Sequence, residues 1–286
     1  MQRDGIITPP SPLWPARLHH VHISTPRLAE MAAFYQRGFS YRIQELRSDL
    51  LYLAGGQRRL LLGSGAAQQL AMAAFALRDA AQLKALRKHV RAQGIALQDV
   101  PTPLLQQGAF AVADPDGRLL AFGLPAPEEA RTDVLPGRLQ HVVVTTRDVP
   151  RVAAFYQEAL GFHVSDRVLT AEGALTTVFL RSDPEHHSFA AFRADVARLD
   201  HHSLEVPSWN TIRDWGDHFA ALEHPIHWGP GRHGPGNNLF FMVKDPDQNW
   251  VEISAELQQM PVGATGRDWP HTERTLNLWG QGMLRS

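Results

Sequence analysis

An internal repeat constrains the fold of this chain more than any other feature. Residues 16–43 (ARLHHVHISTPRLAEMAAFYQRGFSYRI) align with residues 137–164 (GRLQHVVVTTRDVPRVAAFYQEALGFHV), and the shared segment AAFYQ fixes the register. A repeat of this length indicates one supersecondary unit that is used more than once. In this register His20 corresponds to His141. We therefore expect two related halves, each beginning with an alternating strand and an amphipathic helix.

The second half repeats the order of strand, helix and further strands. Its first unit has a predicted helix over 149–160 that ends at Gly161, a residue type that favours a left-handed helix cap. The turn Asp245-Pro246-Asp247-Gln248 separates the last two predicted strands. The other elements predicted in this half are strands over 162–168, 174–181, 187–193, 200–206, 237–243 and 249–254, and a helix over 208–222.

The first half follows the same order. Its second unit is predicted to have strands over 71–77, 109–113 and 118–123 and a helix over 79–93, with Asp114-Pro115-Asp116-Gly117 at the corresponding turn. Four βαβββ units thus account for nearly the whole chain. We predict an α+β fold in which these units pair into two open barrels.

The segment between the halves has the composition of a linker. Residues 124–136 (LPAPEEARTDVLP) are rich in proline, glutamate and alanine and show no periodicity. We therefore expect an N-terminal domain over 1–130 and a C-terminal domain over 131–286. After about residue 256 prolines and glycines recur without periodicity, which indicates a C-terminal tail.

Composition excludes several classes of function. The chain has no cysteine, which rules out disulfides, thiolate nucleophiles, iron–sulfur clusters and cysteine zinc sites. The net charge of −1 provides no basic field for nucleic acid or an anionic membrane, and residues 1–25 contain no long apolar run. We expect a cytoplasmic protein without nucleic-acid or membrane partners. Fifteen histidines favour metal or acid–base chemistry.

Strand alternation predicts which side chains share a face, because residues two apart point the same way. In three strands of the second half the apolar residues fall on one face, and the opposite face then holds one possible metal ligand each. These ligands are His141, His201 and Glu252. Two imidazoles and one carboxylate leave coordination positions open on a divalent ion, the arrangement found in non-haem Fe(II) oxygenases.

Two alternatives accompany this prediction. A histidine on a strand is more often a core or surface residue than a ligand, and His202 competes with His201 for the role. The first half offers an internal comparison, in which Met72 corresponds to His201 and Ala121 to Glu252. A thioether and a methyl group cannot replace these ligands, so we expect no metal site there.

Over about residues 16–256 the chain resembles the vicinal oxygen chelate superfamily, and within it the two-domain type I extradiol ring-cleavage dioxygenases. The motifs that carry the resemblance are LQHVVV, HHSFAAF, LDHHSLEV, GRHGPGNNLFF and KDPDQNWVEI, in that order. The resemblance implies a glyoxalase-like first domain without metal and Fe(II), or less often Mn(II), on His141, His201 and Glu252. It also implies a small aromatic substrate, O2 and a homo-oligomer.

Two further histidines match positions of this family. His187, in HHSFAAF, falls where the family has an acid–base histidine beside the metal, and a histidine there can take a proton from a bound phenol and return it. A surface turn is the alternative for His187, and His186 competes for the role. His233, in GRHGPGNN, matches a histidine that lines the substrate pocket, although a histidine in such a loop can also be merely solvated.

The sequence departs from the family at two positions. Met242 replaces a tyrosine that usually hydrogen-bonds a substrate oxygen, and Trp228 replaces an arginine that binds a substrate carboxylate in some members. A thioether is a poor acceptor and no donor. Phe179 is a third candidate for the wall of an aromatic site, although such residues are more often core.

These observations favour an Fe(II)-dependent extradiol-type dioxygenase that acts on a catechol or related ortho-dihydroxylated aromatic, with an apolar substituent. The Met242 departure supports a second hypothesis, a metal-dependent isomerase, lyase or hydrolase that does not use O2. A protein that only binds an aromatic ligand is a third hypothesis, and the complete triad argues against it.

Overall fold

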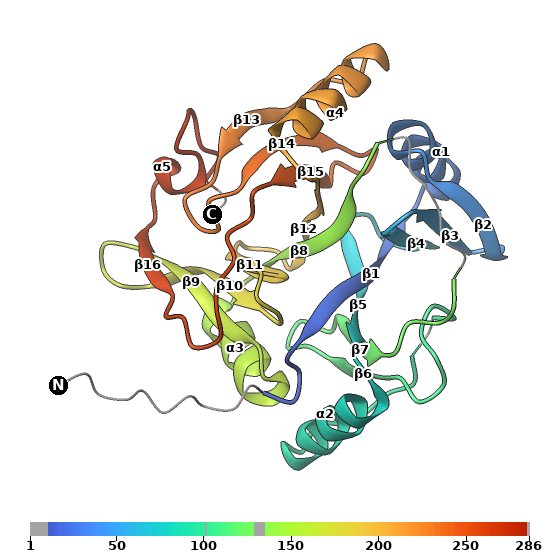
Figure 1. The fold of residues 1–286 in the computed structure, drawn as a ribbon, viewed down its shortest axis with the longest axis vertical. Helices are drawn as coiled ribbons and strands as arrows, with labels where there is room; N and C mark the ends of the chain where they lie inside the picture. Colours follow the sequence, from blue (N-terminus) through green and yellow to red (C-terminus); the bar gives the residue numbers. More distant parts are fainter. Residues whose placement is uncertain (1–10, 101, 129–134, 285–286) are drawn as a thin grey trace.

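The structure, a computed structural model, describes residues 11–100, 102–128 and 135–284. It contains two mixed sheets, one from each half of the chain (Figure 1), which confirms the predicted α+β fold class. The expected domain boundary between residues 130 and 131 lies outside the described residues.

The first sheet is built as the repeat predicts. Its elements are β1 (Ala16–Thr25), α1 (Leu28–Phe39), β2 (Arg42–Arg47), β3 (Leu50–Gly55), β4 (Arg58–Ser64), β5 (Gln69–Leu77), α2 (Ala80–Ala92), β6 (Phe110–Ala113) and β7 (Leu119–Gly123). The strands lie in the order β2-β3-β4-β1-β5-β7-β6. Within the described part of the second unit only two strands follow α2, because the preceding loop contains glycines and a proline and forms only isolated bridges, Gln98 to Ala111 and Leu105 to Pro125.

The second sheet follows the same plan with additions. Its elements are β8 (Arg138–Thr146), α3 (Val149–Ala154), the π-helix η1 (Phe155–Leu160), β9 (His163–Leu169), β10 (Leu175–Arg181), β11 (Phe189–Arg193), β12 (Arg198–Glu205), α4 (Trp209–Ala221), β13 (Trp228–Arg232), β14 (Leu239–Lys244), β15 (Trp250–Ala255), β16 (Arg267–Pro270) and α5 (Glu273–Leu276). The strand order is β13-β14-β15-β12-β8-β11-β10-β9-β16.

The helix predicted over 149–160 is present, but it changes from α to π at Phe155. It ends as predicted at Gly161, whose φ of 86° is the left-handed conformation that glycine adopts without strain. The repeat also holds at the level of pairing: β1 and β8 each pair with one parallel and one antiparallel neighbour.

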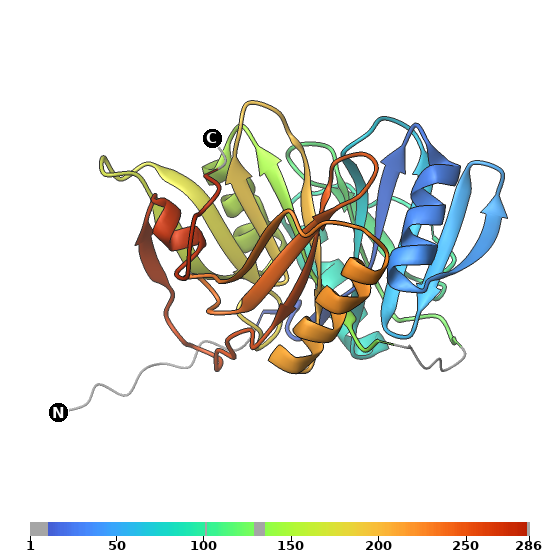
Figure 2. The ribbon, with the colours of Figure 1, turned by 90° about the horizontal axis from the view of Figure 1, so that it is seen from above.

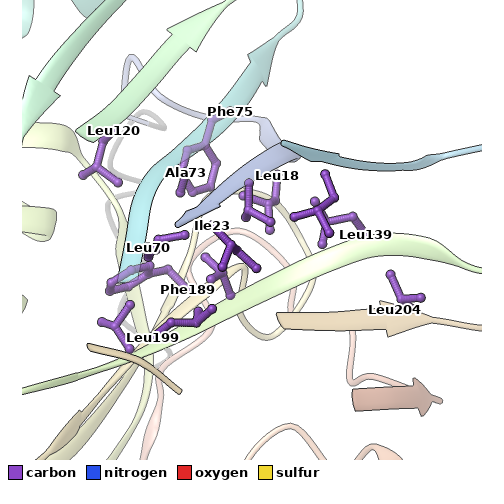
Figure 3. Close-up of a cluster of buried hydrophobic side chains, with 14 of the residues drawn as sticks. Leu18, Ile23, Leu70, Ala73, Phe75, Leu120, Leu139, Phe189, Leu199 and Leu204 are labelled. Atoms are coloured by element: carbon purple, nitrogen blue, oxygen red, sulfur yellow. The ribbon is translucent and has the colours of Figure 1, made fainter. Parts of the chain in front are cut away.

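The two halves share one hydrophobic core, and Figure 2 shows them side by side. The labelled core side chains in Figure 3 come from both halves: Leu18, Ile23, Leu70, Ala73, Phe75, Leu120, Leu139, Phe189, Leu199 and Leu204. Helix α1 of the first half packs against α4 of the second, with the Phe39 ring 5.3 Å from the Phe219 ring. The helix-facing sides of the strands are therefore buried against the other half.

Two hydrogen bonds connect the halves reciprocally. The tyrosine of each AAFYQ segment donates to the first aspartate of the DPD turn in the other half: Tyr35 to Asp245 at 3.1 Å, and Tyr156 to Asp114 at 3.3 Å. All four side chains are buried. The AAFYQ segment and the DPD turn, which both occur once in each half, thus hold the two halves together.

The segment after residue 256, which we interpreted as a tail, has defined structure. Strand β16 pairs parallel to β9, and the short helix α5 follows it. The indole of Trp269 donates to Asp166 at 2.7 Å, and the indole of Trp228 donates to the backbone oxygen of Gln281 at 3.0 Å. This segment therefore closes one side of the second sheet.

Candidate metal centre

A cavity lies within the second half, and it is lined by every residue that the sequence favours as a ligand, acid–base or substrate-binding residue, but not by the rivals His186 and His202. Its walls come from β8, β10, β11, β12, β13, β14 and β15, from α5 and from loops. The lining residues are His141, Val143, Phe179, His187, Phe192, His201, Trp228, His233, Pro235, Met242, Glu252, Thr275 and Leu276.

Three buried ligand atoms converge at this cavity. His141 Nε2 lies 3.2 Å from His201 Nε2 and 3.6 Å from Glu252 Oε2, and His201 Nε2 lies 3.3 Å from the same carboxylate oxygen. The three side chains come from adjacent strands β8, β12 and β15, in which His141 and Glu252 both pair with Ser203. Within the described residues they are the group of histidine and carboxylate side chains able to hold a metal ion.

The donor set fits a divalent metal. Ligand atoms at neighbouring positions about 2.1 Å from an ion lie about 3 Å apart, close to the separations observed here. Burial alone would disfavour ionisation of Glu252, but its contacts with His141 and His201 hold its pKa well below the ordinary value, so the carboxylate is charged. An ionised carboxylate facing two imidazole nitrogens is what a divalent ion requires.

Each of the three ligands is held by a second contact on its outer side. His141 Nδ1 donates to Gln140 Oε1 at 2.5 Å, and His201 Nδ1 donates to Asp200 Oδ1 at 2.6 Å. Asn238 donates to Glu252 Oε1 at 3.0 Å. A proton on Nδ1 of each histidine makes Nε2 the nitrogen that can bind an ion.

We expect Asp200→Ala to weaken metal binding by about 10- to 100-fold, because the acceptor that fixes the His201 ring is lost. Metal affinity is measured by titration of the metal-free protein with Fe(II) or Mn(II). Asp195→Ala, at an exposed position on the preceding loop, is the control and should bind metal normally. Equal affinity in the two variants would contradict the orienting role of Asp200.

His202, the competitor of His201, points into the shared core. Its ring lies 5.8 Å from the Tyr35 ring, and neither of its nitrogens has a hydrogen-bond partner among the described residues. Burial lowers its pKa to about 3, so it is a neutral core side chain. As strand alternation predicts, His201 thus lies on the cavity side of β12 and His202 on the core side.

His187 lines the cavity and His186 does not. The His187 ring is 4.4 Å from the His141 ring, whereas His186 lies behind it, 5.7 Å from the Phe179 ring. Both histidines are buried, so the loop between β10 and β11 is not a solvated surface turn. Geometry favours His187 as the acid–base residue, and that role stays a prediction.

The remaining candidates also surround the cavity. His233 stacks on Phe240 with ring centroids 3.7 Å apart, and its Nε2 lies 4.0 Å from Glu252 Oε2. Trp228 and Met242 face each other across the β13–β14 pair, and Met242 also pairs with Glu252 on β15. Together with Phe179 they form an apolar cluster at the cavity wall.

Comparisons with known proteins agree with this site. Residues 138–253 match the model of the Glyoxalase/Bleomycin resistance protein/Dioxygenase superfamily, and the matched range contains all three candidate ligands. The homoprotocatechuate 2,3-dioxygenase structure from Arthrobacter globiformis superimposes with a TM-score of 0.81 at 23% identity, covering 96% of this chain and 90% of that one. The segment 138–253 is therefore a domain of this superfamily.

Curated relatives of this chain are extradiol dioxygenases. Biphenyl-2,3-diol 1,2-dioxygenase from Paraburkholderia xenovorans (strain LB400) is 28% identical over 257 residues, 83% of this chain and 84% of that one. Metapyrocatechase 2 from Cupriavidus necator is 32% identical over 151 residues, so the match spans 51% of this chain and 45% of that relative. A protein from Rhodococcus jostii (strain RHA1), 26% identical over 258 residues (81% of this chain, 85% of that one), is named an iron-dependent extradiol dioxygenase.

The first half of the chain lacks the corresponding ligands. The register pairs His20 with Ala74, and Ala74 with Ala121, where the second half pairs His141, Ser203 and Glu252. Met72 stands where His201 does. Aliphatic and aromatic side chains fill the space in front of these strands, among them Leu50, Tyr52, Leu61, Met72, Ala74, Ala111 and Ala121.

We therefore expect His20→Ala to leave metal content and turnover nearly unchanged. Met72 and Ala121 stand at the positions of the other two ligands, and among the described residues His20 belongs to no group of three side chains able to hold a metal ion. Burial holds its pKa well below the ordinary value. Metal analysis of the purified variant against the wild type measures this. Loss of a second equivalent of tightly bound metal would show that the first half also binds an ion.

Sequence reasoning missed residues of two kinds. Thr275 and Leu276 line the cavity although they belong to the presumed tail. Gln140 and Asp200 support the ligands, and a signal for them was present: each directly precedes its histidine and has an oxygen acceptor. Within the described residues no helix has the length and apolar character to cross a membrane.

Proposed function

We propose that the protein is an Fe(II)-dependent extradiol-type dioxygenase that cleaves a catechol or a related ortho-dihydroxylated aromatic, with Mn(II) as the alternative metal. The observation that carries the proposal is the convergence of His141, His201 and Glu252 on the wall of an otherwise mainly apolar cavity. When bound, the ion supplies adjacent open positions for the paired oxygens of the substrate and for O2.

The residues around this centre have separable tasks. Burial and the neighbouring His141 and His186 hold the pKa of His187 well below its ordinary value, so its ring is neutral near pH 7 and can accept a proton from a substrate hydroxyl. The same ring can return the proton as the substrate ring opens. His233 is held by its Nδ1 contact with the backbone oxygen of Leu276, and its ring lines the cavity that would hold the substrate.

The cavity walls favour a substrate with an apolar substituent. None of the described residues that line the cavity is a lysine or an arginine, so a substrate carboxylate would find no cationic partner among them. Trp228, Phe179 and Phe192 instead provide aromatic surface, and Met242 offers dispersion contact but no hydrogen-bond donor.

We predict that bulky apolar catechols are cleaved with a higher kcat/KM than 3,4-dihydroxyphenylacetate, and that Met242→Tyr narrows this difference, because it adds a donor and removes space. Oxygen uptake by the anaerobically purified, iron-loaded enzyme against a panel of catechols measures both effects. A preference for the carboxylated substrate would contradict the apolar pocket.

The same assay tests the proposed function itself. Consumption of O2 with at least one catechol is expected. If the iron-loaded enzyme consumes none with any catechol, a metal-dependent isomerase, lyase or hydrolase becomes the better hypothesis, as Met242 would allow. A purified protein without bound metal would instead favour a protein that only binds an aromatic ligand.

We also propose that the enzyme acts in the cytoplasm as a homo-oligomer. Support for the location is a chain without cysteine, and support for the assembly is the family resemblance. Light scattering of the purified protein at working concentration tests the assembly, for which a mass above that of one chain is expected.

A further inference from the structure

A buried row of three side chains leads away from the cavity behind His187. His187 Nδ1 lies 3.0 Å from His186 Nδ1, and His186 Nε2 lies 3.0 Å from Asp166 Oδ2. All three residues are at most 4% exposed. The proposed reaction uses only the first of them, which leaves a histidine and an aspartate buried beside the site without a role.

The donors and acceptors in this row can be ordered in one direction. The Asp166 carboxylate can only accept, so the proton of a neutral His186 ring is favoured on Nε2. His186 Nδ1 then has a lone pair and accepts from Nδ1–H of His187. His187 Nε2 is in turn left without a proton, and this nitrogen belongs to the ring that lines the cavity.

Asp166 is fixed by the segment after residue 256. The indole of Trp269 donates to Asp166 Oδ2 at 2.7 Å, and the backbone amide of Arg267 donates to Asp166 Oδ1 at 2.7 Å. Burial alone would raise the pKa of Asp166, but its contacts with His186, Arg267 and Trp269 lower it, so the carboxylate is ionised. A charged group is therefore held at the far end of the row.

One link is close without being aligned. The contact between His186 Nε2 and Asp166 has the distance of a charge-assisted hydrogen bond, yet the ring nitrogen has no regularly aligned hydrogen-bond partner among the described residues. The charge of Asp166 still favours a proton on the nearer ring nitrogen at this separation. The carboxylate thus selects the tautomer of His186 through its field.

We propose that Asp166 and His186 are positioning residues that hold His187 in the tautomer with its proton on Nδ1, so that Nε2 is ready to accept a substrate proton. The inference rests on the proposed function, because it assigns the row to the proton transfer of that reaction. His186, left open from the sequence as a rival to His187, acts through it.

Two substitutions at the same position separate positioning from packing. A glutamine side chain offers one donor and one acceptor with nearly the spacing of the ring nitrogens, so His186→Gln should keep most of the turnover. His186→Leu has similar bulk but neither group, and should lower kcat by about tenfold or more with little change in KM. Asp166→Asn removes the charge with little change of shape and should lower kcat in the same way. Asp268→Asn, exposed on the neighbouring strand β16, is the control.

Epistasis gives a second readout. In a His187→Phe background, His186→Leu should cause no further loss of kcat, because His186 acts only through the His187 ring that is already absent. Independent losses that multiply would assign His186 a separate structural role and overturn the proposal.

A third readout does not depend on turnover. In the metal-free full chain with ¹⁵N-labelled histidine, nuclear magnetic resonance should show His187 protonated at Nδ1 in the wild type and His186→Gln, and in mixed tautomers in His186→Leu and Asp166→Asn. His187 is assigned from the spectrum of His187→Phe. If His187 has the same tautomer in all variants, the positioning role of His186 and Asp166 is overturned. If the tautomers are as expected but no catechol supports oxygen uptake, only the proposed function is overturned.

Discussion

His201→Ala should abolish stoichiometric binding of iron or manganese while leaving the protein folded. The variant retains one imidazole and one carboxylate, which cannot hold a hard divalent ion at the occupancy of a three-ligand site. Oxygen uptake should fall to background, because the proposed reaction requires the ion. Metal content by elemental analysis and secondary structure by circular dichroism measure the two parts, and His141→Ala and Glu252→Ala should behave in the same way.

His202→Ala is the matched control for this experiment, since it changes the next residue on the opposite face of β12. It should retain metal, although removal of a core ring near Tyr35 will lower the melting temperature. Normal metal occupancy in His201→Ala, together with loss of metal in His202→Ala, would reverse the assignment of the two histidines.

His187→Phe should retain the metal and bind catechols, yet slow turnover by roughly a hundredfold or more, the usual size of a general acid–base contribution. Phenylalanine preserves the ring contact with His141 and Phe179 but can neither accept nor donate a proton. Steady-state oxygen uptake gives kcat and KM, and single-turnover mixing separates binding from chemistry.

The control is His163→Phe, a histidine on β9 that packs against Trp14 outside the cavity. It should turn over at nearly the wild-type rate. An unchanged rate in His187→Phe would move the proton-transfer role to His233, the other histidine on the cavity wall besides the candidate ligands.

Strand periodicity predicted the candidate centre because each candidate ligand sits on a strand whose opposite face is mainly apolar. Val142 and Val144 beside His141, and Val251 and Ile253 beside Glu252, lie in the shared core, so the opposite faces had to meet at the cavity. The repeat then identified which half lacks the ligands. Both inferences need only local alternation and register, which the sequence records directly.

The elements that the sequence did not predict depend on long-range pairing. Strand β13 (WGPGR) contains two glycines and a proline and has a register break against β14, so its local signal is that of a loop. Strand β16 (RDWP) forms only because β9 offers a sheet edge, where a proline is tolerated. Asp200 reaches His201 at a register break between β8 and β12, a placement that strict alternation excludes.

Because of the reciprocal hydrogen bonds of Tyr35 and Tyr156, we expect selection to act differently on two sides of the first half. One side contacts the second half, and the other holds Ala74 and Ala121. Loss of Tyr35 would remove one hydrogen bond from a buried carboxylate on the turn before β15, the strand that holds Glu252, so selection for catalysis extends to α1. Ala74 and Ala121 have no such contact, so other apolar residues of suitable size can replace them during evolution. A mutational scan scored by ring cleavage should therefore find the first half divided into a conserved side and a permissive side, although none of its described residues lines the cavity.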